Sequence, residues 1–237
     1  MLSLSLGHKL SGLGETSENV YSLAFNGTDE YVDLDNVADA IEEGIGTISV
    51  WVKLNTTSST MVMVQARADA SNYINVYYHN GTSEGRIAYR AAGSTKTAVF
   101  TDAIENDGKW HHIAAIWDAD ADSIQIYLDG TLKDTTTGLA TFAGAITTCD
   151  IAQNTAGGSY FDGNITEVAI FARVVHINEL FTTLRQPIDL TGSDDLVGYY
   201  KCDEGSGVVA ADSSGNNNNG DLINTPTWST DVPYRSG

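Results

Sequence analysis

Short apolar runs recur along the chain, separated by turn-forming residues. One run is Thr47 to Leu54, in which Ile48, Val50 and Val52 share one face and Trp51 lies on the other. A period of two is typical of a β-strand with one buried face. Many short strands separated by turn signals predict an all-β fold, a two-sheet antiparallel sandwich or a barrel.

The clearest pattern spans Lys109 to Lys133. Two apolar runs, Trp110 to Trp117 and Ile124 to Leu128, are joined by an acidic segment, which predicts a hairpin. The Asp129-Gly130 dipeptide that follows accommodates positive φ at both central positions of a type I′ turn. A third strand is therefore expected after it, so the region is predicted as a meander in the middle of an antiparallel sheet.

Other segments repeat the strand pattern. Residues 20–34 predict two strands with a tight turn between them, and 36–43 a loop or a single helical turn. One helix is predicted over 177–185, because Ile177, Leu180, Phe181 and Leu184 recur at helical spacing and a proline follows. The remaining predicted strands span 47–54, 61–66, 73–79, 86–91, 97–100, 147–154 and 163–171.

Several of these segments resemble a known family. The motifs that carry the resemblance are 110–114, 126–130, 23–32, 47–53 and 161–171, read as WHHIA, IYLDG, LAFNGTDEYV, TISVWVK and FDGNITEVAIF. In their order along the chain these motifs resemble the laminin-G-like, concanavalin A-like jelly-roll domains of lectins and adhesion modules. The resemblance implies a two-sheet jelly roll with one short helix, of a non-catalytic type.

The end of the chain resembles the same family in a different order. Residues 196–224 resemble a segment that, in many relatives, precedes the strand that here begins at Leu23. Because a jelly roll can bring its termini together, these strands could complete the sheet in permuted order. We expect one domain over 20–237 and an N-terminal arm over 1–19.

The arm alternates Leu2, Leu4 and Leu6 with serines before several glycines. It could add a strand to a neighbouring subunit, giving a homo-oligomer or a shell contact, or it could be a loose terminus, and both interpretations stay open. No apolar stretch is long enough for a membrane span, and the start lacks the pattern of a signal peptide. The expectation is synthesis in a cytoplasm, or a leader already removed.

The net charge of the chain limits the classes of partner that it can bind. The chain of 237 residues carries 31 acidic and 12 basic residues, a formal net charge of −19. This charge disfavours nucleic acid and anionic membranes, and it fits either calcium binding or simple solubility. Cys149 and Cys202 are interpreted as small core residues, with no disulfide framework.

Aromatic residues are the candidates for a sugar-binding surface that the resemblance implies. Trp51 lies opposite the aliphatic face of its strand, so it is either part of a second core layer or an exposed platform. The candidate ligand-binding residues are Trp51, Tyr73, Tyr77, Tyr78, Tyr89 and Tyr160.

The candidate metal is calcium. A tight loop over 212–221 offers carboxylate and amide oxygens, the ligands that calcium prefers, from Asp212, Asn216, Asn218 and Asp221. The alternative is a loop of Asx turns that satisfies its own backbone. Residues 118–129 only imitate a calcium loop, since Ser123 stands at the glycine position. His111 and His112 are adjacent on a strand and cannot chelate one ion.

Catalysis is not expected. Retaining glucanases of this fold carry glutamates on one strand face in a Glu-x-Asp-x-x-Glu pattern, which is absent. Two functions remain. One is a lectin-like module on a virion or extracellular surface that binds a glycan or a surface protein, as decoration or adhesion. The other is a purely structural capsid or tail component, attached through residues 1–19.

Overall fold

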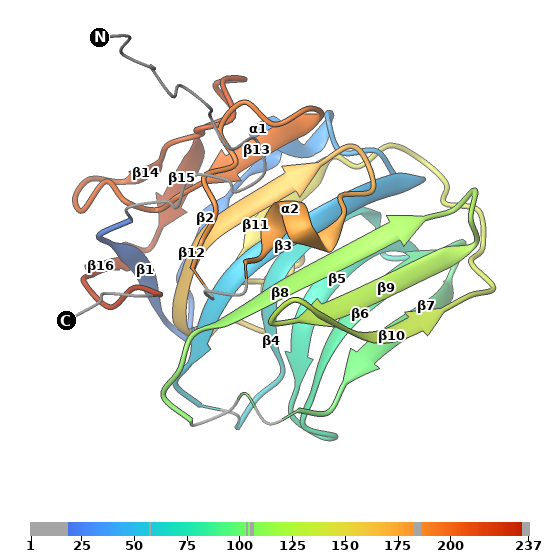
Figure 1. Cartoon of the computed structure of the whole chain (residues 1–237), viewed down its shortest axis with the longest axis horizontal. Helices are drawn as coiled ribbons and strands as arrows, with labels where there is room; N and C mark the ends of the chain where they lie inside the picture. Colours follow the sequence, from blue (N-terminus) through green and yellow to red (C-terminus); the bar gives the residue numbers. More distant parts are fainter. Residues whose placement is uncertain (1–18, 57, 103, 105–106, 183–185, 234–237) are drawn as a thin grey trace, which may run out of the picture.

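Two antiparallel sheets pack face to face (Figure 1). In this computed structural model, the described residues are 19–56, 58–102, 104, 107–182 and 186–233. Within them each sheet has eight strands, which confirms the predicted all-β, two-sheet antiparallel jelly roll. Among the same residues, no helix has the length and apolar character needed to cross a membrane.

Sheet I contains, in spatial order, β10 (Thr131–Thr136), β9 (Ser123–Leu128), β8 (His111–Asp118), β3 (Ile45–Leu54), β12 (Asp162–Phe171), β1 (Ser22–Asn26) and β16 (Thr227–Ser229), with β13 (Leu196–Tyr200) paired to β12. Sheet II contains β14 (Val209–Ala210), β15 (Gly220–Ile223), β2 (Tyr31–Asp33), β11 (Thr148–Ile151), β4 (Met61–Asp69), β5 (Asn72–His79), β6 (Glu84–Ala91) and β7 (Ser94–Phe100).

The core lies between the sheets, where alternate residues of facing strands meet. Ile48, Val50 and Val52 enter it from β3, as their alternation predicts. Trp117 is fully buried, and its indole Nε1 donates to the Glu42 carbonyl at 3.1 Å. Gly46 is required beside this ring, because a Cβ there would lie 2.2 Å from Trp117. Both cysteines are buried and free, as the sequence indicates.

The predicted meander is confirmed as β8, β9 and β10, with Asp129 and Gly130 at φ 48° and 76° in the second turn. It forms one end of sheet I rather than its middle, because β10 has no further partner among the described strands of that sheet. The hydrophobic pattern identifies a strand but does not say how many neighbours follow it.

The predicted pair in residues 20–34 forms as β1 and β2, but the two strands lie in different sheets. The segment between them crosses from sheet I to sheet II instead of closing a hairpin. At this end of the molecule β16 pairs with β1, and β15 pairs with β2. The C-terminal strands therefore complete both sheets beside the N-terminal ones (Figure 1).

The described part of the chain contains two short helices, α1 (Asp35–Ala38) and α2 (Ile177–Leu180). The predicted helix over 177–185 was too long, because Phe181 is extended at φ −143°. Residues 183–185 lie outside the described part. Phe181, just past the helix, stacks on Trp51 with ring centroids 6.0 Å apart.

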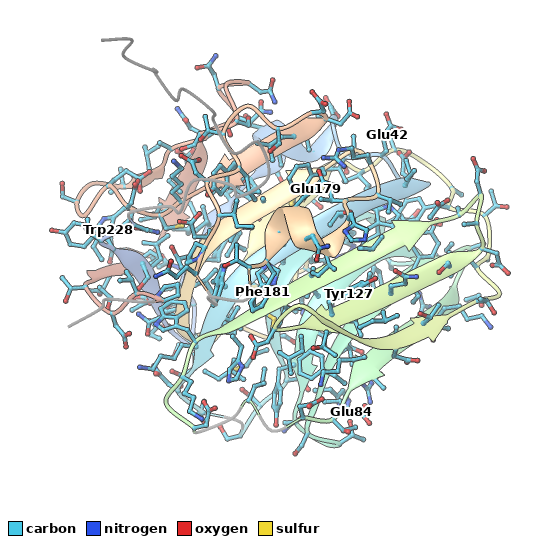
Figure 2. The ribbon with its side chains drawn as sticks, viewed as in Figure 1. Glu42, Glu84, Tyr127, Glu179, Phe181 and Trp228 are labelled. Carbon is cyan, nitrogen blue, oxygen red and sulfur yellow. The ribbon has the colours of Figure 1, made fainter. Side chains whose placement is uncertain are left out.

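The outer face of sheet I carries a second apolar layer. Residues 172–182, including α2, and residues 186–195 lie over this face (Figure 1). Leu180 and Val175 from the first of these ranges pack with Phe171 and Tyr199 of the sheet. Figure 2 shows Phe181 beside α2, in front of the sheet. Trp51 therefore belongs to a second core layer, one of the two predicted interpretations, and is 2% exposed.

Candidate functional site

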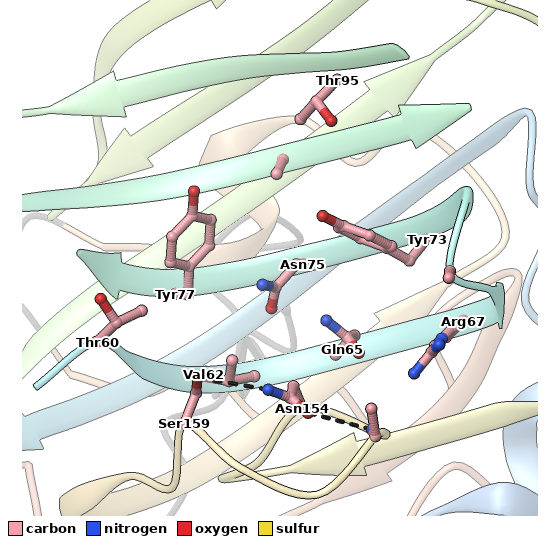
Figure 3. A pocket seen from close by; sticks show the side chains of 13 residues that line it. Thr60, Val62, Gln65, Arg67, Tyr73, Asn75, Tyr77, Thr95, Asn154 and Ser159 are labelled. Atoms are coloured by element: carbon pink, nitrogen blue, oxygen red, sulfur yellow. Dashed lines mark hydrogen bonds between the residues drawn. The ribbon is translucent and has the colours of Figure 1, made fainter. Parts of the chain in front are cut away.

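A groove of about 350 Å³ crosses the outer face of sheet II (Figure 3). Side chains of β4, β5 and β6 form its floor, and the segment 154–159 forms one wall. Its volume lies at the lower end of the range typical of ligand sites. Two of the predicted aromatic residues, Tyr73 and Tyr77, line it.

The alternation of β5 places these rings. Ile74, Val76 and Tyr78 point into the core, so Tyr73 and Tyr77 point outward. The four-residue separation puts their Cα atoms about 14 Å apart. Asn75 lies between the two rings on the same face (Figure 3).

The register of β4, β5 and β6 arranges the floor in three cross-strand rows. In the middle row, Gln65 lies opposite Asn75, and Asn75 opposite Ala88. The small side chain of Ala88 leaves the space between the tyrosine rings open. In the outer rows, Arg67, Tyr73 and Arg90 are neighbours at one end, and Val62, Tyr77 and Arg86 at the other.

Arginines support both rings from β6. The Arg86 Cζ atom lies 5.9 Å from the Tyr77 ring centroid, and the Arg90 Cζ atom lies 5.9 Å from that of Tyr73. Arg86 is held by Glu84, whose carboxylate accepts a hydrogen bond from the Arg86 Nε at 2.8 Å. These contacts limit the movement of the rings, which a stacking surface requires.

Amide groups supply polar contacts in the groove. The Oδ1 atom of Asn75 is buried and accepts no hydrogen bond from the described residues. Gln65 Oε1 accepts from the backbone and the hydroxyl of Thr155, each at 3.1 Å, which ties the wall to β4. Asn154 Nδ2 donates to Ser159 Oγ at 3.4 Å within the wall.

The other predicted aromatic residues lie elsewhere. Tyr78 and Tyr89 are each 1% exposed and belong to the core, so like Trp51 they present no ring face to a ligand. Tyr89 donates from its hydroxyl to the Glu43 carbonyl at 3.1 Å, and burial raises its pKa to about 12. Tyr160 is partly buried just after the wall and does not line the groove.

The predicted calcium loop satisfies its own backbone. The Asp212 carboxylate accepts hydrogen bonds from three backbone N–H groups, those of Tyr199, Ser214 and Asn218, and from the Ser214 hydroxyl. The Asn216 and Asn218 amides donate to carbonyls of β13. This geometry fits the Asx-turn alternative, and calcium at the loop stays a prediction.

A different group of carboxylates, Asp33, Asp35 and Asp150, could hold a metal ion. One oxygen from each lies within 4.8 Å of the others. Burial raises the pKa of Asp150 to about 7, and Asp33 and Asp35 add to the rise against a lowering bond from Gln153. Asp221, a predicted ligand, is the cross-strand neighbour of Asp33. Sequence reasoning missed this cluster because only strand register brings Asp150 to Asp33.

The adjacent histidines face opposite ways, as predicted for a strand. His112 is fully buried, its Nε2 lies 2.8 Å from Ser49 Oγ, and burial lowers its pKa to about 4. His111 lies between Asp129 and Asp107, at 3.0 Å and 3.1 Å. Burial lowers the pKa of His111, but its bonds to the two carboxylates outweigh burial and raise it.

Solved structures share this fold. A candidate carbohydrate binding protein from Bacteroides ovatus matches with a TM-score of 0.66 and 17% identity, over 93% of this chain and 63% of that one. The CBM40 domain of Ruminococcus gnavus IT-sialidase matches with a TM-score of 0.54 and 14% identity, over 68% of this chain and 96% of that one. Domains LG4-5 of mouse laminin alpha1 match with a TM-score of 0.52 and 10% identity, over 72% and 47%.

At these identities the structures share the fold alone, and the chain spans less than two thirds of the Bacteroides protein. No curated protein sequence matches it. Residues 26–180, more than half of the chain, match a family of the concanavalin A-like lectin/glucanases superfamily. The chain belongs to this superfamily, as its sequence motifs indicate.

Proposed function

We propose that the chain is a non-catalytic carbohydrate-binding module that holds an oligosaccharide in the groove of sheet II. The observation that carries the proposal is the pair of tyrosine rings, Tyr73 and Tyr77, on one uncovered face with Asn75 and Ala88 between them. Aromatic faces stack on the apolar faces of sugar rings, and amides pair with hydroxyl groups. A separation of about 14 Å suits an oligosaccharide rather than a single sugar.

The composition of the groove supports binding rather than hydrolysis. None of the described residues that line it is Asp or Glu. Retaining glycosidases need two carboxyl groups roughly 5–5.5 Å apart across the scissile bond. Two structural neighbours are described as a carbohydrate binding protein and as a carbohydrate-binding domain of a sialidase, which is consistent with the same role here.

The proposal is tested by a glycan array followed by affinity measurements on variants. Tyr73→Ala and Tyr77→Ala are each expected to weaken binding of a glycan that the array identifies by about tenfold, since stacking contacts are lost. The matched control is Tyr127→Ala, because Tyr127 lies on the outer face of sheet I (Figure 2). Equal affinity of all four proteins for that glycan would contradict the groove as its site.

The second part of the proposal concerns where the module acts and how it is attached. The module would act on an extracellular or virion surface, as decoration or adhesion, and the alternative is a purely structural capsid or tail component. Attachment to such a particle would use residues 1–19, of which 1–18 lie outside the described part. Deleting residues 1–18 is expected to abolish self-association or shell attachment while leaving glycan affinity unchanged. Unchanged sedimentation of the shortened protein would remove the support for attachment through the arm.

A further inference from the structure

Most of the Lys and Arg side chains that the structure describes are paired with carboxylates. Ion pairs join Lys53 to Asp231, Arg86 to Glu84, Lys109 to Asp107, Lys133 to Asp102, Arg173 to Glu179 and Lys201 to Asp189. Among the described Lys and Arg residues, this leaves Arg67, Arg90 and Lys96 with no carboxylate oxygen within 4.0 Å. Two of these three residues, Arg67 and Arg90, are cross-strand neighbours of the same residue.

The residue that Arg67 and Arg90 share as a neighbour is Tyr73. Register puts Arg67 on one side of Tyr73 and Arg90 on the other, all on the outer face of sheet II. Arg67 lines the groove near the end of β4 (Figure 3). Lys96 is instead the cross-strand neighbour of Tyr89, whose ring belongs to the core, so Lys96 lies on the opposite face.

The two arginines have unused donors. Arg90 Nη1 donates to Thr95 Oγ1 at 3.1 Å, but its Nε is buried without an acceptor in the described structure. Asp69, on the same strand as Arg67, is engaged by the turn that follows. The pKa of Asp69 is lowered first by the Ser71 backbone bond and then by Asn72, and Arg67 contributes least. A guanidinium otherwise seeks a planar anion that it can bind through two N–H groups.

Extending the proposed function, on which it rests, we infer that the groove selects an anionic saccharide, whose carboxylate or sulfate group lies between Arg67 and Arg90 beside Tyr73. The formal charge of −19 repels anions at long range, so recognition must come from short contacts in a region free of carboxylates. None of the described residues that line the groove is Asp or Glu, so the nearest carboxylates lie outside its lining. The neutral part of the saccharide extends along Asn75 toward Tyr77.

The test compares matched probes by isothermal titration calorimetry. The probes are lactose, sialylated lactose, sulfated lactose and trigalacturonate. At least one acidic probe is expected to bind about tenfold or more tightly than lactose, since a charge-assisted pair adds to stacking. Preference for carboxylated or for sulfated probes identifies the acid, and either preference supports the inference.

Variants locate the acid. Arg67→Gln and Arg90→Gln are each expected to lower the affinity for the acidic probe about tenfold, and Arg67→Lys to restore only part of it, because an ammonium lacks the planar fork. The matched control is Lys96→Gln, which removes an unpaired cation from the other face and should change nothing. Circular dichroism of each variant checks that the fold is retained.

Two outcomes overturn the inference. The first is that no acidic probe binds more tightly than lactose, and the second is that Arg67→Gln and Arg90→Gln lose no more affinity than Lys96→Gln. The proposed function fails differently, through glycan binding that is unaffected by Tyr73→Ala and Tyr77→Ala. If a neutral glycan binds through the tyrosines but not the arginines, the proposed function holds and the inference of an anionic ligand fails.

Discussion

The outer faces of the two sheets differ, although both sheets share one core. On sheet I, the described residues between β12 and β13 cover the outer face with apolar side chains. On sheet II, the outer face of β4 to β6 carries Tyr73, Asn75 and Tyr77 with only the wall at 154–159 beside them. The molecule therefore uses one outer face for stability and leaves the other available for a ligand.

The burial patterns of individual strands show the same difference between the two sheets. Nine consecutive residues of β12, Gly163–Phe171, are buried, whereas burial alternates at every position of β5. A strand covered on both faces becomes continuously apolar, and a strand covered on one face alternates. The predictions that follow test this contrast, beginning with the largest expected effect.

Removing a ring from the covered face should destabilise the protein strongly. Phe171 is 1% exposed and packs in the second apolar layer. Phe171→Ala is expected to lower the free energy of unfolding by about 3–5 kcal/mol, because it loses buried area and leaves a cavity. Urea denaturation measures the change. A loss below about 1 kcal/mol would show that the layer adds little stability.

A change of pH should alter the stability contributed by a buried group on each sheet in opposite directions. Asp150, on sheet II, has its pKa raised to about 7 from 3.8, so folding binds a proton between these values and the stability that it contributes is lost as pH rises through about 7. Asp150→Asn is expected to be more stable than the wild type at pH 8, by on the order of a few kcal/mol, and no more stable at pH 4. Thermal unfolding in EDTA measures this, and equal differences at both pH values would contradict it.

His112, under the cover of sheet I, gives the opposite slope. Its pKa is lowered to about 4 from 6.5, so its contribution to stability is complete above about 6.5 and is lost as pH falls through about 4. His112→Gln is expected to show a shallower loss of stability between these values than the wild type. Urea midpoints across this range provide the measurement, and an unchanged slope would assign acid sensitivity elsewhere.

Calcium remains a prediction from the sequence, and two variants locate it. Because both oxygens of Asp212 already accept hydrogen bonds, Asp212→Asn is expected to preserve any rise in melting temperature caused by added calcium. Differential scanning fluorimetry in calcium and in EDTA measures the rise. Its loss in Asp212→Asn but not in Asp150→Asn would instead place the ion in the loop.

Truncation on the open face should have the smallest effect on stability. Tyr77 is only partly buried and lies outside the core. Tyr77→Ala is expected to lower the free energy of unfolding by less than about 1 kcal/mol, although it weakens glycan binding. A loss as large as that of Phe171→Ala would show that the two outer faces do not differ.

Alternation in the sequence predicts most strands and the sandwich, because burial of one face imposes a period of two. It does not predict strand partners, so the separation of β1 and β2 into different sheets required the structure. The alternation could have separated core from surface tyrosines: Tyr78 is an even number of residues from Ile74 and Val76, and therefore faces the core with them. The Asp150 cluster and the position of Arg67 beside Tyr73 depend on register, which local sequence does not encode.

The adjacent residues Tyr77 and Tyr78 give β5 an unusual sensitivity to changes in chain length. One belongs to the groove and the other to the core, so a single-residue insertion or deletion within the strand would exchange every ligand-facing side chain for a core one. Such length changes can be accommodated only in turns, such as residues 80–83. Length variants that keep the fold should therefore also keep the order of side chains along the groove.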